Sequence, residues 1–433
     1  MEKRALFKQW LSSGAASLHP LTFPQRELWE ASPIPVADVS HHICCLIVLR
    51  GLVSRGAWDM ASQMVMARHE VLRLSILPGR EQPVQLVRQV FPPNTSFREL
   101  SASECSDEAI DAIATEEFNK PFDLLQGPLY RLQLMRRSSD EYLAALTIHH
   151  AIADGWSLGV FVKELCADYA QSVLGAGAPL PPPALSYTAW GAAERAAWTP
   201  AKLEHCATFW RAKLEGRPRL WDTPSGQVER WITQIPLETA DAARELARVS
   251  GATLFSTLLA VFQIALARWT GQPDTVVGSP VANRASQAAR EIIGYCANTV
   301  PLRTRVDPDR VFADALRETH DTTVECFANA MPFAELVRAV GDPAYEVRFA
   351  MQNHPMPDVV LHGFSAKLKM RSSGTARFQI GCEIFVVPGG LEVLWMFRSA
   401  LIPKSEVETL ECLFTTLLEA ACRSPQSRIA SLP

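Results

Sequence analysis

The sequence of 433 residues predicts an α/β fold that is divided into two lobes. In both halves of the chain, segments with the two-residue period of a strand alternate with segments of helical period. Between the halves, the segment 175–183 ends in three consecutive prolines, which can neither continue a helix nor lie in a central strand. We therefore place a first lobe at residues 1–178, an interlobe linker at 179–200 and a second lobe at 201–433.

The first lobe is predicted to contain a sheet with an interior strand. Residues 142–148, Tyr-Leu-Ala-Ala-Leu-Thr-Ile, are almost continuously apolar, which is typical of a strand covered on both faces. The run 156–174 has apolar residues at helical spacing and predicts the helix that follows this strand. The other elements predicted for this half are strands at 42–49, 72–77, 84–90 and 130–135 and helices at 58–69 and 106–118.

The second half repeats this mixture of elements. Its most apolar segment, 254–269, contains Gln263 and Arg268 and is shorter than the ~18–20 apolar residues that span a membrane, so we expect a buried helix. The sequence Pro388-Gly389-Gly390 between two strands predicts a hairpin turn. The other predicted elements are helices at 240–249, 312–326, 333–340 and 404–422 and strands at 275–279, 299–303, 346–351, 379–386 and 392–397.

Composition argues against several classes of partner and location. The 42 Lys and Arg residues nearly balance 46 Asp and Glu residues, and no block of like charge stands out, so we expect neither a nucleic-acid partner nor a membrane surface. The ten cysteines are scattered and form no C-x-x-C pair, which fits a reducing compartment. Because the first residues lead into no apolar signal segment, we expect a cytoplasmic protein.

One motif points to chemistry. Residues 149–155 read His-His-x-x-x-Asp-Gly, a pattern expected by chance roughly five times in ten thousand chains of this composition. The motif follows the interior strand and precedes a helix, and such strand ends open onto the crevice where α/β folds bind ligands. The helix terminus adds unpaired N–H groups and partial positive charge, and a glycine there allows a substrate to approach the backbone closely.

Three interpretations of this motif compete. In a metal site, His149, His150 and Asp154 would be ligands, although adjacent residues of a strand point to opposite faces. In a structural interpretation, both histidines would be core residues and Asp154 would cap the helix. In the catalytic interpretation, which we favour, one histidine faces the crevice as a general base while Asp154 organises the loop.

The chain resembles a condensation domain of a nonribosomal peptide synthetase, within the wider chloramphenicol-acetyltransferase-like superfamily. The similarity extends over nearly the whole chain. The segments 21–29, 68–73, 149–157, 187–190, 278–284 and 293–303 are similar to the first six motifs of the family, and 427–433 is similar to the linker that leads to an adenylation domain.

This resemblance implies two acyltransferase-like lobes in a V-shaped pseudo-dimer with the active-site tunnel between them. The second lobe would carry a floor loop at about 278–298 and, at about 378–398, a latch hairpin that crosses to the first lobe. Donor and acceptor carrier proteins would be partners, and their phosphopantetheine arms would bear the substrates, with no cofactor or metal bound by the domain itself. An adenylation domain would follow, and the domain would be a monomer.

The resemblance also implies the reaction. The amine of an acceptor aminoacyl thioester attacks a donor acyl or peptidyl thioester and forms an amide. By this resemblance His150 would be the catalytic histidine. Independently of the resemblance, the position of Gly155 at the helix terminus makes its N–H, with the terminus itself, a candidate donor to the developing oxyanion.

Other residues would support this site. His149 and Asp154 would be structural, and Arg284 would reach Asp154 from the other half as a rigid bidentate pair. The residues expected to line the tunnel are Trp156, Ser157, Asn298 and Gln352.

Two functions of other classes remain open at this point. An acyltransferase that uses coenzyme A or a carrier, with a free acceptor, shares the pattern His-x-x-x-Asp, but its plant-type members also carry Asp-Phe-Gly-Trp-Gly, which this sequence lacks. A recruitment domain without chemistry tends to have an eroded motif. Here His149, His150, Asp154 and Gly155 are all present.

Overall fold

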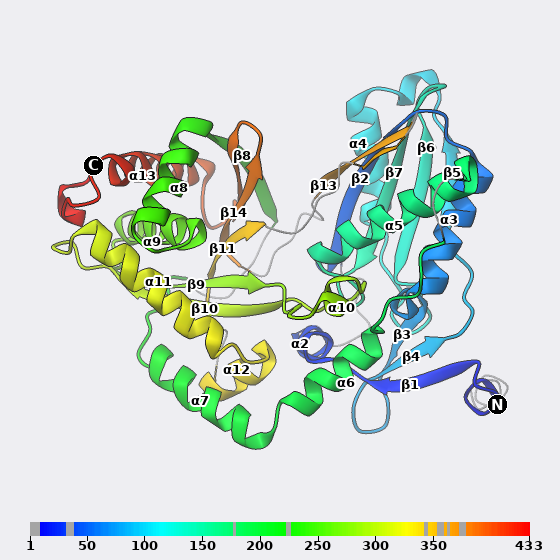
Figure 1. Ribbon diagram of the computed structural model, residues 1–433, viewed down its shortest axis with the longest axis horizontal. Helices are drawn as coiled ribbons and strands as arrows, with labels where there is room; N and C mark the ends of the chain where they lie inside the picture. The colour runs from blue at the N-terminus through cyan, green and yellow to red at the C-terminus, as the bar shows by residue number, and fades with distance from the viewer. Residues whose placement is uncertain are drawn as a thin grey trace. The chain divides into compact units, whose positions relative to one another are not determined.

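The computed structural model describes residues 9–31, 39–175, 179–221, 227–341, 345–352, 359–361, 364–371 and 378–433. It has a mixed α/β fold with two compact units, each built on its own six-stranded sheet (Figure 1). The first unit consists of Met1–Trp198, Ala282–Ala297 and His354–Ser373. The second consists of Thr199–Val281, Asn298–Asn353 and Gly374–Pro433. The predicted α/β fold is confirmed.

The sheet of the first unit has the strand order β12-β13-β2-β7-β6-β5. Strand β7 (Glu141–His149) lies between β2 (His42–Arg50) and β6 (Tyr130–Arg136) and is antiparallel to both. All of its residues from Tyr142 onward are buried, which confirms the predicted interior strand.

Different helices cover the two faces of this sheet. Alternate residues of β2 and β7 pack in one core cluster with side chains of α3 (Arg55–Arg68) and α5 (Gly155–Leu174). The intervening residues pack in a second cluster with α4 (Asp107–Phe118). The remaining elements of this unit are β1 (Ala16–Pro20), α2 (Phe23–Ala31), β3 (Leu74–Leu77), β4 (Val84–Arg88), β5 (Thr95–Glu99), α6 (Tyr187–Ala197) and α10 (Gln287–Arg290).

A late segment of the chain completes this sheet. Strand β13 (Phe364–Arg371) pairs with β2, and β12 (Val359–Leu361) adds the outer strand. The prediction that the hairpin at 378–398 crosses to the first lobe is wrong. Strands β14 (Ile380–Val387) and β15 (Gly390–Arg398) do form a hairpin, but both are hydrogen-bonded within the sheet of the second unit.

The predicted boundaries also differ from the units. Residues 282–297, expected in the second lobe as part of its floor loop, belong to the first unit. The expected linker 179–200 contains helix α6, which Ser186 caps and whose Tyr187 and Trp190 are buried. The strand expected from residue 72 begins at Leu74, because the preceding residues form a short 3-10 helix.

The sheet of the second unit has the order β10-β9-β11-β14-β15-β8. Helix α9 (Leu254–Thr270) is buried from Ser256 to Ala267, as predicted. Among the described residues, no single helix is long and apolar enough to cross a membrane, and α8 with α9 meets that test only as a pair bent by 106°. The other elements are α7 (Pro200–Leu214), β8 (Val228–Pro236), α8 (Leu237–Val249), β9 (Asp274–Val281), β10 (Asn298–Arg305), α11 (Phe312–Ala328), α12 (Phe333–Val340), β11 (Val347–Gln352) and α13 (Lys404–Arg423).

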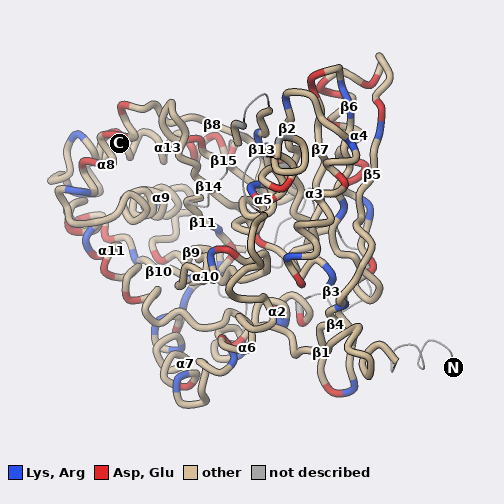
Figure 2. Tube along the Cα trace, turned by 45° about the vertical axis from the view of Figure 1, so that its right-hand side comes forward, with Lys and Arg blue, Asp and Glu red and all other residues tan. Residues whose placement is uncertain are grey.

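Charged residues are distributed over both units. Along the residues drawn in colour in Figure 2, basic and acidic positions are interspersed rather than gathered in one long block of a single sign. Other charged residues are buried inside the units, and Asp154 and Arg284 are two of them.

Candidate active site

The His149–Gly155 motif connects β7 to α5 within the first unit (Figure 1). Strand β7 ends at His149, and α5 begins at Gly155. The connection is tight, because the N–H of His150 donates to the carbonyl of His41 (2.7 Å) and the N–H of Ile152 donates to that of His149 (3.0 Å). The two histidines are adjacent, but the fold places them in different environments.

His149 lies in the core with 4% of its surface exposed. Its Nδ1 accepts a hydrogen bond from the N–H of Ala151 (3.1 Å). An imidazole nitrogen that accepts carries no proton, so the neutral ring has its proton on Nε2. The rings of His41, His42 and Phe122 surround it, with centroids 5.9–6.2 Å away.

His150 is only half-buried. Its ring packs against the ring of Tyr295, with centroids 4.3 Å apart and planes inclined by 60°. This is an edge-to-face arrangement, which restricts the orientation of both rings. Of the two imidazoles in the motif, His150 is therefore the accessible one.

Asp154 is the centre of the surrounding hydrogen-bond network. It caps α5, and its Oδ1 accepts from the N–H of Ser157 (2.9 Å). Its Oδ2 accepts from the N–H groups of Cys296 and Ala297 (both 3.1 Å). Burial would raise the pKa of Asp154, but the charge of Arg284 and these hydrogen bonds outweigh it and lower the pKa. Asp154 is therefore an ionised, fully bonded carboxylate.

Arg284 pairs with Asp154 in a geometry other than the predicted one. A single nitrogen, Nη2, lies 3.0 Å from Oδ1 and 3.1 Å from Oδ2, so the pair is not a two-nitrogen fork. The other terminal nitrogen, Nη1, donates to the carbonyls of Ala289 and Ile292 (both 2.7 Å) and makes no hydrogen bond to Asp154. Both partners lie in the first unit, so Arg284 does not reach across from the second one.

The neighbours of Asp154 differ in exposure. Ser157 is completely buried, and its Oγ lies 2.8 Å from Oδ1 of Asp154 and accepts from the N–H of Gly294 (3.1 Å), so it is not available to line a tunnel. Trp156 is half-buried and donates its indole N–H to the carbonyl of Arg290 (2.8 Å). Gly155 is also half-buried, and as the first residue of α5 its N–H has no partner within the helix.

Two predicted residues belong to the second unit. The side-chain amide of Asn298 donates to the carbonyl of Met331 (2.8 Å) and accepts from the N–H of Phe333 (3.0 Å), which fixes the start of α12. Gln352 donates to Glu383 (3.0 Å). The structure thus brings the motif residues, Trp156 and Arg284 together in one unit, and describes Asn298 and Gln352 in the other.

Several residues that support the motif were not predicted. The side chain of Gln25 donates to the carbonyl of Ala151 (2.9 Å) inside the motif. The hydroxyl of Tyr187 donates to the carbonyl of Tyr295 (2.9 Å). Gln25 and Tyr187 both lie in the segments that resemble the first and fourth family motifs, but sequence similarity does not reveal hydrogen-bond partners.

The segment 68–73, which resembles the second family motif, is hydrogen-bonded to helices α5 and α6. Nη2 of Arg68 lies 2.9 Å from each oxygen of Asp168 on α5. His69 lies 2.9 Å from Glu164 on the same helix. Oε1 of Glu70 accepts from the N–H of Thr188 on α6 (2.8 Å). These charged residues therefore hold helices together in the first unit.

The chemistry of the site is that of an imidazole and a polarised backbone. Among the residues that the structure describes, no group of three or more His, Cys, Asp or Glu side chains could hold a metal ion. The oxygens of Asp154 are already engaged by Arg284, Ser157 and two backbone N–H groups. The geometry thus supports proton transfer or positioning by His150 beside the first turn of α5.

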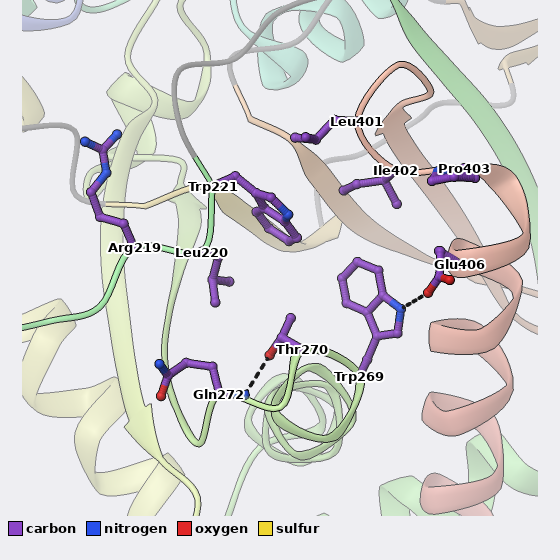
Figure 3. Close-up of a pocket in the computed structure, with 10 residues that line it drawn as sticks. All are labelled: Arg219, Leu220, Trp221, Trp269, Thr270, Gln272, Leu401, Ile402, Pro403 and Glu406. Carbon is purple, nitrogen blue, oxygen red and sulfur yellow. Dashed lines mark hydrogen bonds between the residues drawn. The ribbon is translucent and has the colours of Figure 1, made fainter.

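A cavity of about 400 Å³ lies elsewhere, in the second unit (Figure 3). The indole rings of Trp221 and Trp269 line it, and the N–H of Trp269 donates to Glu406 (3.0 Å). Ile402 and Pro403 add apolar surface beside the start of α13. None of the residues predicted for the active site lines this cavity, so its volume does not identify the site.

Comparison with known proteins gives one consistent result. The family described as the condensation domain matches residues 16–433. A linear gramicidin synthase of Brevibacillus parabrevis is 30% identical over 96% of this chain and 6% of its own length. Phosphinothricin tripeptide synthetase PhsB of Streptomyces viridochromogenes is 31% identical over 96% of this chain and 37% of its own length. The chain therefore spans only a minor part of these relatives.

Solved structures show the same fold. The first condensation domain of the calcium-dependent antibiotic synthetase, in complex with a substrate analogue, aligns with a TM-score of 0.85 at 20% identity, over 97% of this chain and 99% of that one. The X-domain of teicoplanin biosynthesis, in complex with OxyB, aligns with a TM-score of 0.83 at 19% identity, over 96% and 95%.

Proposed function

The chain belongs to the condensation-domain family of nonribosomal peptide synthetases, and from this premise we propose that His150 acts on the acceptor amine during peptide-bond formation. The family joins two substrates that are carried as phosphopantetheinyl thioesters. The observation that carries the proposal is the difference between the two histidines. His150 is accessible at the carboxyl end of β7, whereas His149 is buried with Nδ1 engaged.

The reaction needs help with a proton. An amine with the reference pKa of ~7.7–8.0 is already partly neutral near pH 7, so a base is not chiefly required to create the nucleophile. When the nitrogen bonds to the thioester carbon, its attached proton becomes acidic and must leave. The C–S bond then breaks, and the products are an amide and the free thiol of the donor carrier. His150 serves this step by accepting the proton or by orienting the amine.

Gly155 is proposed to stabilise the oxyanion. Its N–H opens α5, where the helix dipole adds partial positive charge and no helix carbonyl competes for the group. Asp154 lies close by, but its charge is balanced by Arg284, which keeps the field at the helix terminus favourable to an anion. Asp154 and Arg284 are therefore proposed to hold the loop rather than to react.

The chain is further proposed to work inside a multidomain synthetase. Its relatives are considerably longer, which fits neighbouring carrier and adenylation domains. The donor and acceptor would then arrive on separate carriers. An assay that supplies the same acyl donor either on a carrier protein or as a coenzyme A thioester tests whether the donor must be bound to a carrier. Comparable rates with the two donors would favour the free-standing acyltransferase function instead.

The test of the catalytic role is His150→Ala, assayed with a loaded donor carrier and a loaded acceptor carrier. We expect product formation to fall roughly 10²- to 10⁴-fold with an unchanged melting temperature, because the half-buried ring contributes little to the core. His205→Ala on the exposed face of α7 is the matched control and should keep full turnover. Wild-type turnover by folded His150→Ala protein would contradict the proposal, whereas no product formation by the wild-type protein itself would favour a recruitment function.

A further inference from the structure

We infer that Tyr295 is a positioning residue for His150, and that the Asp154 network acts on the imidazole by holding Tyr295 in place. This inference rests on the proposed role of His150. In this inference, the side chain of Tyr295 orients the imidazole of His150. The buried carboxylate of Asp154 affects catalysis indirectly, because it fixes the position of Tyr295.

The first step is the contact between the rings. The centroids of His150 and Tyr295 are 4.3 Å apart, well within the range in which aromatic pairs attract each other. Tyr295 is 8% exposed, so its ring is packed and has little freedom to turn. His150 is the more exposed partner of the pair. The packed ring therefore sets the orientation of the exposed one.

The second step is the backbone around Tyr295. On one side, the carbonyl of Gly294 accepts from Nη2 of Arg284 (2.9 Å). On the other side, the N–H groups of Cys296 and Ala297 both donate to Oδ2 of Asp154. The peptide groups that flank Tyr295 are thus bound to one ion pair, and this leaves the ring no freedom to shift with its backbone.

The third step is the carbonyl of Tyr295 itself. It accepts from the hydroxyl of Tyr187, whose oxygen also lies 2.9 Å from Oγ1 of Thr22. Because a carbonyl can only accept, the single proton of Tyr187 goes to Tyr295, and Thr22 must donate to Tyr187. The ring of Tyr187 stacks on Trp190, with centroids 5.7 Å apart and planes inclined by 10°, so this donor is fixed as well.

The same carboxylate therefore controls both members of the ring pair. Oδ1 of Asp154 caps α5, and so fixes the end of the loop that bears His150. Oδ2 fixes the segment that bears Tyr295. A shift of the carboxylate would change the distance between the two rings.

The test compares two tyrosines in the first unit. Tyr295→Leu should lower kcat for peptide-bond formation about 3- to 10-fold, with an unchanged KM for the acceptor carrier, because the ring contact orients His150 but binds no substrate. Tyr295→Phe keeps the ring and the backbone carbonyl and should restore most of kcat. Tyr142→Leu is the matched control: Tyr142 is 7% exposed, lies in β7 about 25 Å along the strand from His150, and should lose stability without losing kcat.

The outcomes are separable. Wild-type kcat in Tyr295→Leu, or an equal loss in Tyr142→Leu, would overturn the positioning role. Adding Tyr295→Leu to His150→Ala should cause no further loss, and an independent further loss would show that Tyr295 acts by another route. If Tyr295→Leu does not fold, Tyr187→Phe keeps the ring that stacks on Trp190 but removes the hydroxyl that donates to Tyr295 and accepts from Thr22. This variant should lower kcat less strongly, and an unchanged kcat would count against the inference. Full turnover in His150→Ala would instead reject the proposed function.

Discussion

One guanidinium nitrogen of Arg284 serves both oxygens of Asp154, while the other nitrogen holds the carbonyls of Ala289 and Ile292. The pair is therefore more than a salt bridge. It attaches the start of α5 to the segment 284–297, and both side chains are almost completely buried.

Removing either partner should destabilise the protein. Asp154→Ala and Arg284→Ala should each lower the free energy of unfolding by about 3–5 kcal/mol, since the remaining charge stays buried without its partner. The double variant should cost about 1–3 kcal/mol less than the sum of the single variants. Urea unfolding measures these values. Strict additivity would show that the residues do not interact. Arg244→Ala, which breaks an exposed pair with Asp241 on α8, should change stability by less than about 1 kcal/mol.

Acid should weaken the network around Asp154. The folded state lowers the pKa of this carboxyl, so its stabilisation is present above the unfolded value near 3.8 and is lost as the pH falls through the folded value. The melting temperature should therefore drop steeply in this acid range. Asp154→Asn should show a flatter profile below pH 4. An identical acid profile in wild type and Asp154→Asn would contradict the lowered pKa.

Glu194 should make stability depend on pH in the direction opposite to that of Asp154. Burial raises its pKa to about 7, although a hydrogen bond from the side chain of Asn283 (2.9 Å) partly offsets this. A raised pKa means that the folded state binds a proton which the unfolded state releases near pH 4.5, so stability falls as the pH rises from there through 7. Glu194→Gln can still accept from Asn283 and should be more stable than wild type at pH 8 by roughly 3 kcal/mol. The two proteins should be equally stable at pH 4, and a constant difference across the pH range would exclude this explanation.

Gly294 should not tolerate a side chain. A Cβ atom at this position would lie 2.2 Å from the ring of Tyr187, which is itself packed on Trp190 and cannot yield easily. Gly294→Ala should therefore cost about 1–3 kcal/mol of stability. The control is Gly56→Ala in α3, where a Cβ would meet no atom within 4 Å and where alanine favours the helix. Measured by thermal unfolding, the melting temperature should be lower than that of the wild type for Gly294→Ala and equal or higher for Gly56→Ala.

The parts of the fold that were predicted depend on local pattern. Strand β7 and helix α5 follow from apolar periodicity, and the histidine motif between them stands out by composition alone. Strand β13 was missed, although its buried Phe364, Ala366 and Leu368 alternate as a strand requires. Its partner β2 lies far away in the chain, and no local pattern specifies that pairing.

For the candidate site, the sequence predicted several of the residues that take part but not how all of them contact one another. The motif residues and Arg284 were identified, because family motifs preserve residue types that the chemistry and the fold require. The contact of Tyr295 with His150 and the sharing of Arg284 between a carboxylate and two carbonyls were not. Both depend on how the segment 282–297 packs against α5 and α6, which is a property of tertiary structure.

The pairing of β13 with β2 has a consequence for synthesis of the chain on the ribosome. Ser365 pairs with Arg50, so the sheet cannot be completed until more than three hundred further residues have been translated. Until then β2, once paired with β7 on one side, has an open edge on the other, and it carries apolar residues such as Ile47 and Leu49, which is the kind of strand that invites aggregation. A fragment ending at residue 198 would keep this edge permanently. Nascent chains of this protein therefore depend on slow, late closure of the sheet, and chaperone demand should peak before residue 371 emerges.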